Sequence, residues 1–280
     1  MPALYDVIGS SYAASRRADP VLVGLLADYV ALAPSGSYLD LACGTGNYTV
    51  ALSAIGGRWT GLDISNQMLE QARQKSQAIT WLQSDAADLP FQAGVFDGAI
   101  CTLALHHFKN LAGPFAEVRR IIRSGSFVIF TGLPEQMKHY WLGHYFPQMM
   151  ARSIKNMPEE SNIREALSCA GFGSVDLFPF FVTPELQDLF LYAGKDRPGL
   201  YLDAVVRSNI SSFATLTSSA ELQSGLARLA EDLQSGAFHD VRAQHRTADG
   251  DYAFILARSD AQPFATADLL QMATPARAGG

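Results

Sequence analysis

Short, almost wholly apolar runs alternate along the first half of the chain with stretches in which apolar residues recur every three or four positions. Runs of the first kind are typical of strands buried on both faces, and the second pattern is typical of amphipathic helices. The predicted strands cover residues 37–42, 58–63, 79–83, 95–103 and 126–131, and the predicted helices between them cover 47–55, 66–76 and 111–123. This alternation predicts βαβ units, and therefore an α/β fold with a doubly wound, mostly parallel sheet.

The regular alternation stops after Thr131. The next segment is rich in aromatic residues, His and Met, and it is followed by a predicted helix and strand. A long helical stretch with a plausible start at Thr183-Pro184 comes next, and its leucines recur at helical spacing. The predicted ranges are a helix at 161–170, a strand at 174–182, helical structure over about 184–235 and a last strand at 251–257. We expect the two irregular segments, 135–160 and 184–237, to form a helical cap over the substrate.

The two ends of the chain are expected to lie outside the main domain. Residues 1–34 read as helical, with Asp19 as a cap before a proline at the first helical position. We therefore divide the chain into an N-terminal helical lid (1–34), a main domain (35–260) and a loosely held tail (261–280).

A glycine turn follows the first predicted strand. Asp40 lies four residues before Gly44, Gly46 completes a Gly-x-Gly sequence, and Asp63 ends the second predicted strand. Glycines at a strand-to-helix turn let a ligand approach the backbone, and an acidic residue about twenty positions on can accept ribose hydroxyls. The dinucleotide fingerprint is incomplete, because Thr49 stands where its third glycine belongs.

These residues resemble motif I of the class I S-adenosylmethionine (SAM) methyltransferases, Asp-x-x-x-Gly-x-Gly. The turn at 83–91 resembles the adenine-binding turn of the same family, and 96–108 resembles its fourth-strand motif. The resemblance covers about residues 37–132 and is greatest to the small-molecule group that includes the ubiquinone and menaquinone C-methyltransferases. It implies a Rossmann-like sheet of seven strands, the last antiparallel, with SAM as cofactor.

The resemblance also assigns roles to single residues. Asp40 would hold the cofactor's ammonium group, Asp63 the ribose, and Asp85 with the backbone of Ala86 the adenine. A leading helix would bring Tyr5 and Tyr12 to the sulfonium or the substrate and Arg16 to the cofactor carboxylate. The complete set of implied cofactor contacts is Tyr12, Arg16, Asp40, Ala42, Gly44, Gly46, Asp63, Ile64, Met68, Asp85, Ala86 and Leu103.

Each of these assignments has a structural alternative. Asp40 would then tie down its own loop, Asp63 would cap the helix that Ser65 already caps, Asp85 would be a solvated turn residue, and the N-terminal segment would only pack as a helix.

Candidates for contact with the methyl acceptor follow the fourth strand and lie in the first cap segment. His106 or His107 could deprotonate a hydroxyl or an amine, or could simply shape the loop by bonding to backbone. Tyr140 and His144 lie four positions apart and would share a helix face in an aromatic substrate pocket. No third ligand accompanies them at helical spacing, so we expect no metal.

Another set of candidates lies in the second cap segment. Lys195, Arg197 and Tyr201 could grip an acidic substrate group, or form a solvated helix end.

The amino-acid composition limits the classes of partner that the protein is expected to bind. The hydrophobic fraction of 48% and charged fraction of 17% are those of an ordinary globular protein. A net charge of −6 without basic runs argues against nucleic acid. Cys43, Cys101 and Cys169 fit no metal spacing, and no apolar stretch reaches membrane-spanning length. We expect a cytoplasmic protein that does not bind membranes and whose partner is a small molecule, and a homodimer stays open.

The sequence therefore predicts a SAM-dependent methyltransferase (EC 2.1.1.-) that transfers a methyl group to an oxygen, nitrogen, carbon or sulfur atom of a small molecule. The alternatives are a SAM-binding enzyme that catalyses cyclisation or elimination, an NAD-dependent oxidoreductase, and a non-catalytic SAM sensor.

Overall fold

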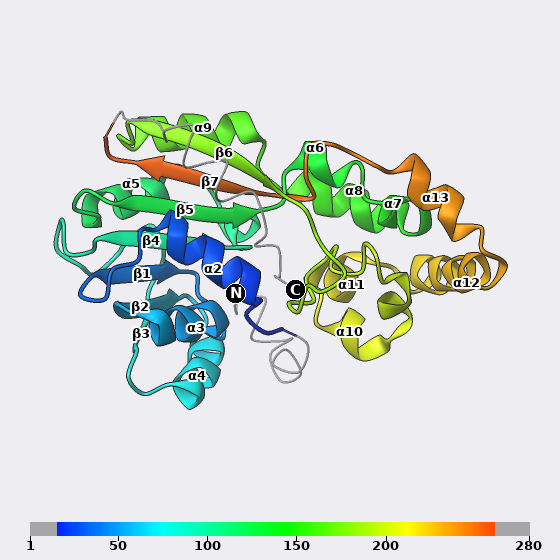
Figure 1. The fold of residues 1–280 in the computed structure, drawn as a ribbon, viewed down its shortest axis with the longest axis horizontal. Helices are drawn as coiled ribbons and strands as arrows, with labels where there is room; N and C mark the ends of the chain where they lie inside the picture. The colour runs from blue at the N-terminus through cyan, green and yellow to red at the C-terminus, as the bar shows by residue number, and fades with distance from the viewer. Residues whose placement is uncertain (1–15, 261–280) are drawn as a thin grey trace, which may run out of the picture.

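A seven-stranded sheet forms the centre of the protein in the computed structural model, which describes residues 16–260 (Figure 1). Its strand order is β3-β2-β1-β4-β5-β7-β6. The strands are β1 (Ser37–Leu41), β2 (Arg58–Asp63), β3 (Thr80–Gln83), β4 (Gly98–Thr102), β5 (Ser126–Thr131), β6 (Ser174–Phe180) and β7 (Tyr252–Arg258). Strands β1 to β5 pair in parallel, and β7 runs antiparallel to both β5 and β6. The predicted mostly parallel α/β sheet with an antiparallel last strand is confirmed.

Helices cover both faces of the sheet, because each βαβ crossover must return over one face. One layer consists of α2 (Pro20–Tyr29), α3 (Asn47–Ile55) and α4 (Asn66–Lys75), and the other of α5 (Ala112–Ile121) and α9 (Glu160–Cys169). The side chains of β5 show how one strand serves both layers. Val128 and Phe130 belong to the core on the α2 face, whereas Phe127 and Ile129 belong to the core under α5 and α9.

The cap consists of two insertions that lie together beyond the carboxyl ends of the parallel strands (Figure 1). Between β5 and β6 lie α6 (Pro134–Met137), α7 (Leu142–Tyr145) and α8 (Pro147–Asn156). Between β6 and β7 lie η3 (Pro198–Leu202), α10 (Ala204–Ser208), α11 (Ser211–Leu216), α12 (Ser219–Ser235) and α13 (Phe238–Gln244). Helix α8 packs against α11, and α7 packs against α12.

Aromatic side chains join the cap to the sheet. The rings of Tyr140 and Tyr192 stack with their centroids 3.8 Å apart, and Trp141 meets the ring of Phe238 edge-on at 4.9 Å. These residues are buried in the same core as Phe254 of β7. The cap therefore shares one continuous core with the α2 face of the sheet, which holds it in a defined position.

The prediction of a helix starting at Thr183-Pro184 is wrong. Residues 181–197 form turns and irregular structure, and helical structure begins only with η3. The physical reason is that Phe190 and Tyr192, two positions apart, are both buried in the core, and the irregular backbone allows both side chains to be buried. The leucine stripe does lie on a helix, α12, which Ser218 caps by accepting a hydrogen bond from the Glu221 N–H.

Two predicted N-cap residues are confirmed at the starts of α2 and α4, two of the helices that cover the sheet. Oδ1 of Asp19 accepts hydrogen bonds from the N–H groups of Val21 and Leu22, and Oγ of Ser65 accepts one from Met68. The predicted tail and residues 1–15 of the predicted lid, with Tyr5 and Tyr12, lie outside the described residues. Within residues 16–260, no helix has the length and apolar character needed to cross a membrane.

Candidate cofactor and acceptor site

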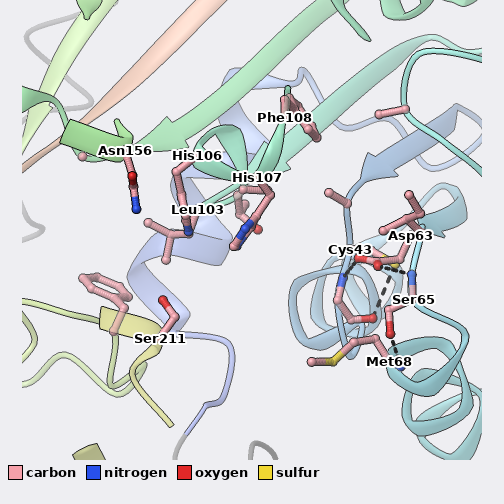
Figure 2. A pocket seen from close by; sticks show the side chains of 18 of the residues that line it. Cys43, Asp63, Ser65, Met68, Leu103, His106, His107, Phe108, Asn156 and Ser211 are labelled. Atoms are coloured by element: carbon pink, nitrogen blue, oxygen red, sulfur yellow. Dashed lines mark hydrogen bonds between the residues drawn. The ribbon is translucent and has the colours of Figure 1, made fainter. Parts of the chain in front are cut away.

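A cavity of about 880 Å³ lies at the carboxyl ends of β1, β2 and β4 and extends under the cap. Its volume is near the upper end of the roughly 300–1,000 Å³ that is usual for ligand pockets. Residues from both ends of the cavity are drawn in Figure 2. Asp63, Ser65 and Met68 lie at one end, Asn156, His106 and Ser211 lie at the other, and His107 lies between them. The cavity therefore has a sheet end and a cap end.

The glycine turn after β1 forms part of the sheet end. Gly44 has a φ of +54°, and a Cβ at this position would meet no atom within 4 Å, so it would project into open space. Gly46, at φ +72°, is needed for a different reason, because a Cβ there would lie 2.4 Å from the Trp81 ring. Gly44 lines the cavity, whereas Gly46 is buried and is not among its lining residues. The structure therefore explains the glycine at position 46 by close packing against Trp81, and its predicted contact with the cofactor stays a prediction.

Ala42 and Leu103 follow the ends of β1 and β4, and both have a left-handed backbone, with φ of 57° and 53°. Both residues line the cavity. Left-handed backbone is uncommon for residues with a side chain, and such strain concentrates at functional sites. The two adjacent strand ends therefore turn sharply where a ligand would lie.

Asp63, the last residue of β2, joins two turns by its carboxylate. Oδ2 accepts a hydrogen bond of 2.8 Å from the Gly44 N–H, and Oδ1 accepts one of 2.8 Å from the Ser65 N–H. Each carboxylate oxygen can accept more than one hydrogen bond, and the side chain also faces the cavity. Asp63 thus supports the glycine turn while remaining accessible to a ribose. Its helix-capping role and its predicted role as a cofactor ligand are therefore compatible.

Asp40 is buried within β1 and is not among the lining residues. Oδ2 accepts a hydrogen bond of 2.6 Å from the Thr49 hydroxyl, and Oδ1 is buried without a partner among the described residues. Burial, opposed by the Thr49 hydrogen bond and assisted by the nearby charge of Asp63, raises the pKa of Asp40 to about 7. The structure therefore shows Asp40 tying helix α3 to β1, and its predicted contact with an ammonium group stays a prediction.

Four predicted contacts surround the rest of the sheet end. Asp85 lies in an exposed turn, where Oδ1 accepts a hydrogen bond from the Ala87 N–H, and Ala86 beside it is buried. Met68 is buried in α4, whereas Ile64 is 58% exposed although it is a large apolar residue. All four line the cavity. An exposed isoleucine beside an acidic turn is a suitable surface for a flat, polar-edged ring.

Arg16 reaches the cavity wall from the segment before α2, but its guanidinium already has a partner. Nε and Nη2 donate hydrogen bonds to the two carboxylate oxygens of Asp188, which is almost completely buried. The Tyr48 hydroxyl donates to the same carboxylate at 3.1 Å. The structure thus assigns Arg16 a role in joining the N-terminal segment to the cap, and its predicted contact with the cofactor carboxylate is untested.

We expect Asp188→Asn to lower the free energy of unfolding by about 3–5 kcal/mol, because the Arg16 guanidinium then loses its two hydrogen bonds to a buried carboxylate. Urea unfolding monitored by circular dichroism measures the change. The double variant Arg16→Met/Asp188→Asn should recover part of the loss, because neither charge is then left alone. A double variant as unstable as the sum of both single variants would contradict the coupling.

His106 and His107 lie in η2 (Leu105–His107), directly after β4, and both line the cavity. Their ring centroids are 3.9 Å apart. Burial, with a smaller contribution from the neighbouring His107, lowers the pKa of His106 to about 3, and burial lowers the pKa of His107 to about 4. Both imidazoles are therefore neutral at physiological pH, and each has one nitrogen that accepts a hydrogen bond and one that donates.

Tyr140 and His144 do not take the predicted place in a substrate pocket. Tyr140 is 2% exposed, and its hydroxyl donates a hydrogen bond to the Asp251 carbonyl. His144 is exposed on α7 and packs beside Tyr145. Neither is among the lining residues, because the aromatic stacking that fixes the cap turns Tyr140 into the core. No group of three or more His, Cys, Asp or Glu side chains that could hold a metal ion occurs in the part of the chain that the structure describes.

The three residues of the second cap segment that could bind an acidic substrate group make hydrogen bonds and an ion pair within the protein instead. Lys195 forms an ion pair with Asp251 at 2.7 Å, Arg197 donates to the Leu186 carbonyl, and the Tyr201 hydroxyl donates to the Leu191 carbonyl. None of the three lines the cavity. Their polar groups hold the irregular segment 181–197 in place.

The sequence did not single out the residues that form the cap end of the cavity. They come from α8, from the irregular segment and from α11, and they are Ser153, Asn156, Met157, Asp188, Phe190, Leu191, Ile210, Ser211, Ser212, Thr215 and Leu216. They lie within the two predicted cap segments. The sequence therefore identified the segments, but not the residues in them that line the cavity. No motif or spacing distinguishes these residues, because they come together only where segments far apart in the chain pack against one another, as α8 does against α11.

The residues at the sheet end of the cavity have the features that SAM binding requires. Gly44 leaves open space where a side chain would stand, Asp63 offers carboxylate oxygens at the cavity wall, and Ile64 exposes an apolar surface next to the Asp85 turn. These features match the methionine part, the ribose and the adenine of an adenosyl cofactor in turn.

Sequence comparison supports the same conclusion. The family model of the methyltransferase domain matches residues 39–130. The malonyl-[acyl-carrier protein] O-methyltransferase of Erwinia pyrifoliae is 38% identical over 98 residues, which are 35% of this chain and 37% of that protein. The demethylmenaquinone methyltransferase of Staphylococcus epidermidis is 36% identical over 97 residues, 32% of this chain and 40% of that protein. The matches therefore span about two fifths of these relatives and about a third of this chain.

A solved structure extends the similarity to the cap. A protein from an antibiotic biosynthesis pathway of Anabaena variabilis, provisionally assigned as a methyltransferase, is 31% identical with a TM-score of 0.78. The alignment covers 87% of this chain and 98% of that one. With the sheet order, the glycine turn and the acidic residues of the cavity, these comparisons show that the chain belongs to the class I SAM-dependent methyltransferases.

Proposed function

We propose that this protein transfers the methyl group of SAM to a small molecule held under the cap, by direct displacement. The observation that carries the proposal is a single cavity with two unlike ends. Its sheet end has the adenosyl-binding features, and its cap end provides separate space beside His106 and His107. A nucleotide-binding protein without an acceptor has no need for this second compartment.

The chemistry that SAM supplies is an electrophilic methyl group on a sulfonium, which becomes a neutral thioether when the bond from carbon to sulfur breaks. The protein's own contribution is to place the acceptor in line with that methyl group and to exclude water. Asp63 and the glycine turn fix the cofactor from the sheet end. The cap covers the acceptor, and the neutral imidazoles after β4 can accept a hydrogen bond from its hydroxyl or amine.

We expect His107→Ala to lower the turnover number roughly tenfold to a hundredfold while the dissociation constant for SAM changes less than threefold, because the ring lies between the two ends of the cavity. His107→Gln keeps a polar side chain and should retain more activity than the alanine variant if a hydrogen bond matters more than proton transfer. Steady-state kinetics and calorimetry measure the two quantities. Unchanged turnover in both variants would return His107 to a purely structural role.

Calorimetry on the purified chain tests the proposal first. SAM and S-adenosylhomocysteine should bind at one site per chain, and NADH should not compete with them. Incubation with SAM and candidate small molecules should then give products that gain one methyl group, detected by mass spectrometry. Products formed without methylation would favour the cyclase or eliminase alternative, and binding of NADH in place of SAM would favour the oxidoreductase alternative.

A further inference from the structure

The cap end of the cavity presents uncharged polar side chains from three separate elements. Asn156 ends α8, Ser211 and Ser212 begin α11, and His106 belongs to η2. Figure 2 shows Asn156, His106 and Ser211 around the same end of the pocket, away from Asp63. Helices α8 and α11 pack against each other, so Asn156 and the two serines keep fixed relative positions.

Several of these groups have no hydrogen-bond partner among the residues that the structure describes. The side chains of Asn156, Ser211 and Ser212 make no hydrogen bond to any residue in the range 16–260. Oγ of Ser153 and Nδ1 of His106 are buried and unpaired among the same residues. Asn156 is exposed and Ser211 is half-buried, so their side chains are open to a ligand that enters this end of the cavity. Buried polar atoms are normally paired, so the unpaired Ser153 Oγ and His106 Nδ1 in the lining of the same cavity indicate a ligand that supplies the missing partners.

The rest of this end is apolar. Its walls are formed by Met137, Met157, Phe190, Leu191, Ile210, Leu216 and Tyr252. Thioether and aromatic side chains of this kind suit a flat or bulky apolar body.

All but one of the charged groups that line the cavity are either paired with each other or placed at its sheet end. Arg16 and Asp188 neutralise each other, and Asp63 and Asp85 belong to the sheet end. Lys109 also lines the cavity but is exposed. Among the cap-end residues of α8, the irregular segment and α11, the only charged side chain is Asp188, which is paired with Arg16, so a charged ligand group there would gain no opposite charge from them in return for its lost hydration.

We propose that the cap end binds an uncharged, mainly apolar acceptor through a hydroxyl or carbonyl oxygen, and that Asn156 and Ser211 position this acceptor beside His106. This assignment rests on the proposed function and goes further by naming the chemical class of the acceptor and two positioning residues. The Asn156 amide accepts from a hydroxyl or donates to a carbonyl, so it suits either oxygen.

Calorimetry with a matched pair of probes tests this assignment on the full chain saturated with S-adenosylhomocysteine. The probe 1-naphthol is uncharged and carries one hydroxyl, whereas 1-naphthoate has the same ring with a negative charge. We expect saturable binding of 1-naphthol and at least tenfold weaker binding of 1-naphthoate. Asn156→Leu should weaken 1-naphthol binding about tenfold, because the hydroxyl then enters the cavity without a partner. Lys155→Leu, on the same helix and outside the cavity lining, is the matched control and should bind as the wild type does.

The outcomes separate this assignment from the proposed function. A chain that fails to bind S-adenosylhomocysteine overturns both. Normal cofactor binding with equal or tighter binding of 1-naphthoate, with no saturable binding of 1-naphthol, or with an unchanged Asn156→Leu variant overturns the acceptor class alone.

Discussion

Replacing Asp63 by alanine should weaken SAM binding roughly 30- to 700-fold. Hydrogen bonds to a charged group each contribute about 1.5–3 kcal/mol, and losing about 2–4 kcal/mol at the ribose corresponds to this range at 1.4 kcal/mol per tenfold. The carboxylate stands at the cavity wall at the end of β2, which is where a ribose is held in sheets of this topology. Isothermal titration calorimetry with SAM measures the effect.

The same carboxylate also accepts the N–H groups of Gly44 and Ser65, so the variant needs a control for loosening of the turn. Asp63→Asn keeps one acceptor oxygen and should have intermediate affinity. Glu70→Ala removes an exposed carboxylate from α4 outside the cavity lining and should bind SAM normally. An Asp63→Ala protein that melts like the wild type and binds SAM within threefold of it would refute the assignment.

The second large effect is on stability and concerns Asp40. Its pKa is raised from 3.8 to about 7, so between these values the folded protein binds a proton that the unfolded chain has lost. The free energy of unfolding therefore falls as pH rises through this window, by about 4 kcal/mol in total between pH 4 and pH 8. The cause is burial of a carboxylate whose Oδ1 has no partner among the described residues.

Asp40→Asn removes this dependence, and the amide oxygen of the new side chain can still accept the hydrogen bond from the Thr49 hydroxyl. The difference in unfolding free energy between variant and wild type should shift in favour of the variant by about 4 kcal/mol from pH 4 to pH 8, as measured by urea unfolding at each pH. His106 and His107 act in the opposite direction, because their lowered pKa values make the protein less stable as pH falls below 6.5. Both proteins contain these histidines, so the difference isolates Asp40.

If the difference in unfolding free energy between Asp40→Asn and the wild type stays constant between pH 5 and pH 8, Asp40 is ionised throughout this range. The variant also tests the cofactor role: if Asp40 acts on the ammonium group, SAM binding should weaken even where the fold becomes more stable, as is common when functional groups carry strain.

The cofactor half of the site was predictable because its signals are local. A strand, a tight turn and the following helix lie within a few residues of each other, and the geometry of that unit restricts which residue types fit. Gly44 leaves open space at the cavity wall, whereas Gly46 packs closely against Trp81. The sequence could not separate these two uses, because both require the same absence of a side chain.

The acceptor half was not predictable in the same way. Tyr140 and His144 have the right spacing for a shared helix face, but the core turns Tyr140 inward and leaves His144 outside. Asn156 and Ser211, 55 positions apart by their numbers, meet at the cavity only because α8 packs against α11.

The amino-acid order alone determined the alternating strands and helices, the parallel sheet and the glycine turn after β1, because periodicity and turn chemistry act over a few neighbouring residues. Only the tertiary structure decided which side chains face the second compartment, which charges are paired, and where Asp188 and Phe190 lie. These depend on contacts between segments far apart in the chain, and such contacts leave no periodic mark in the sequence.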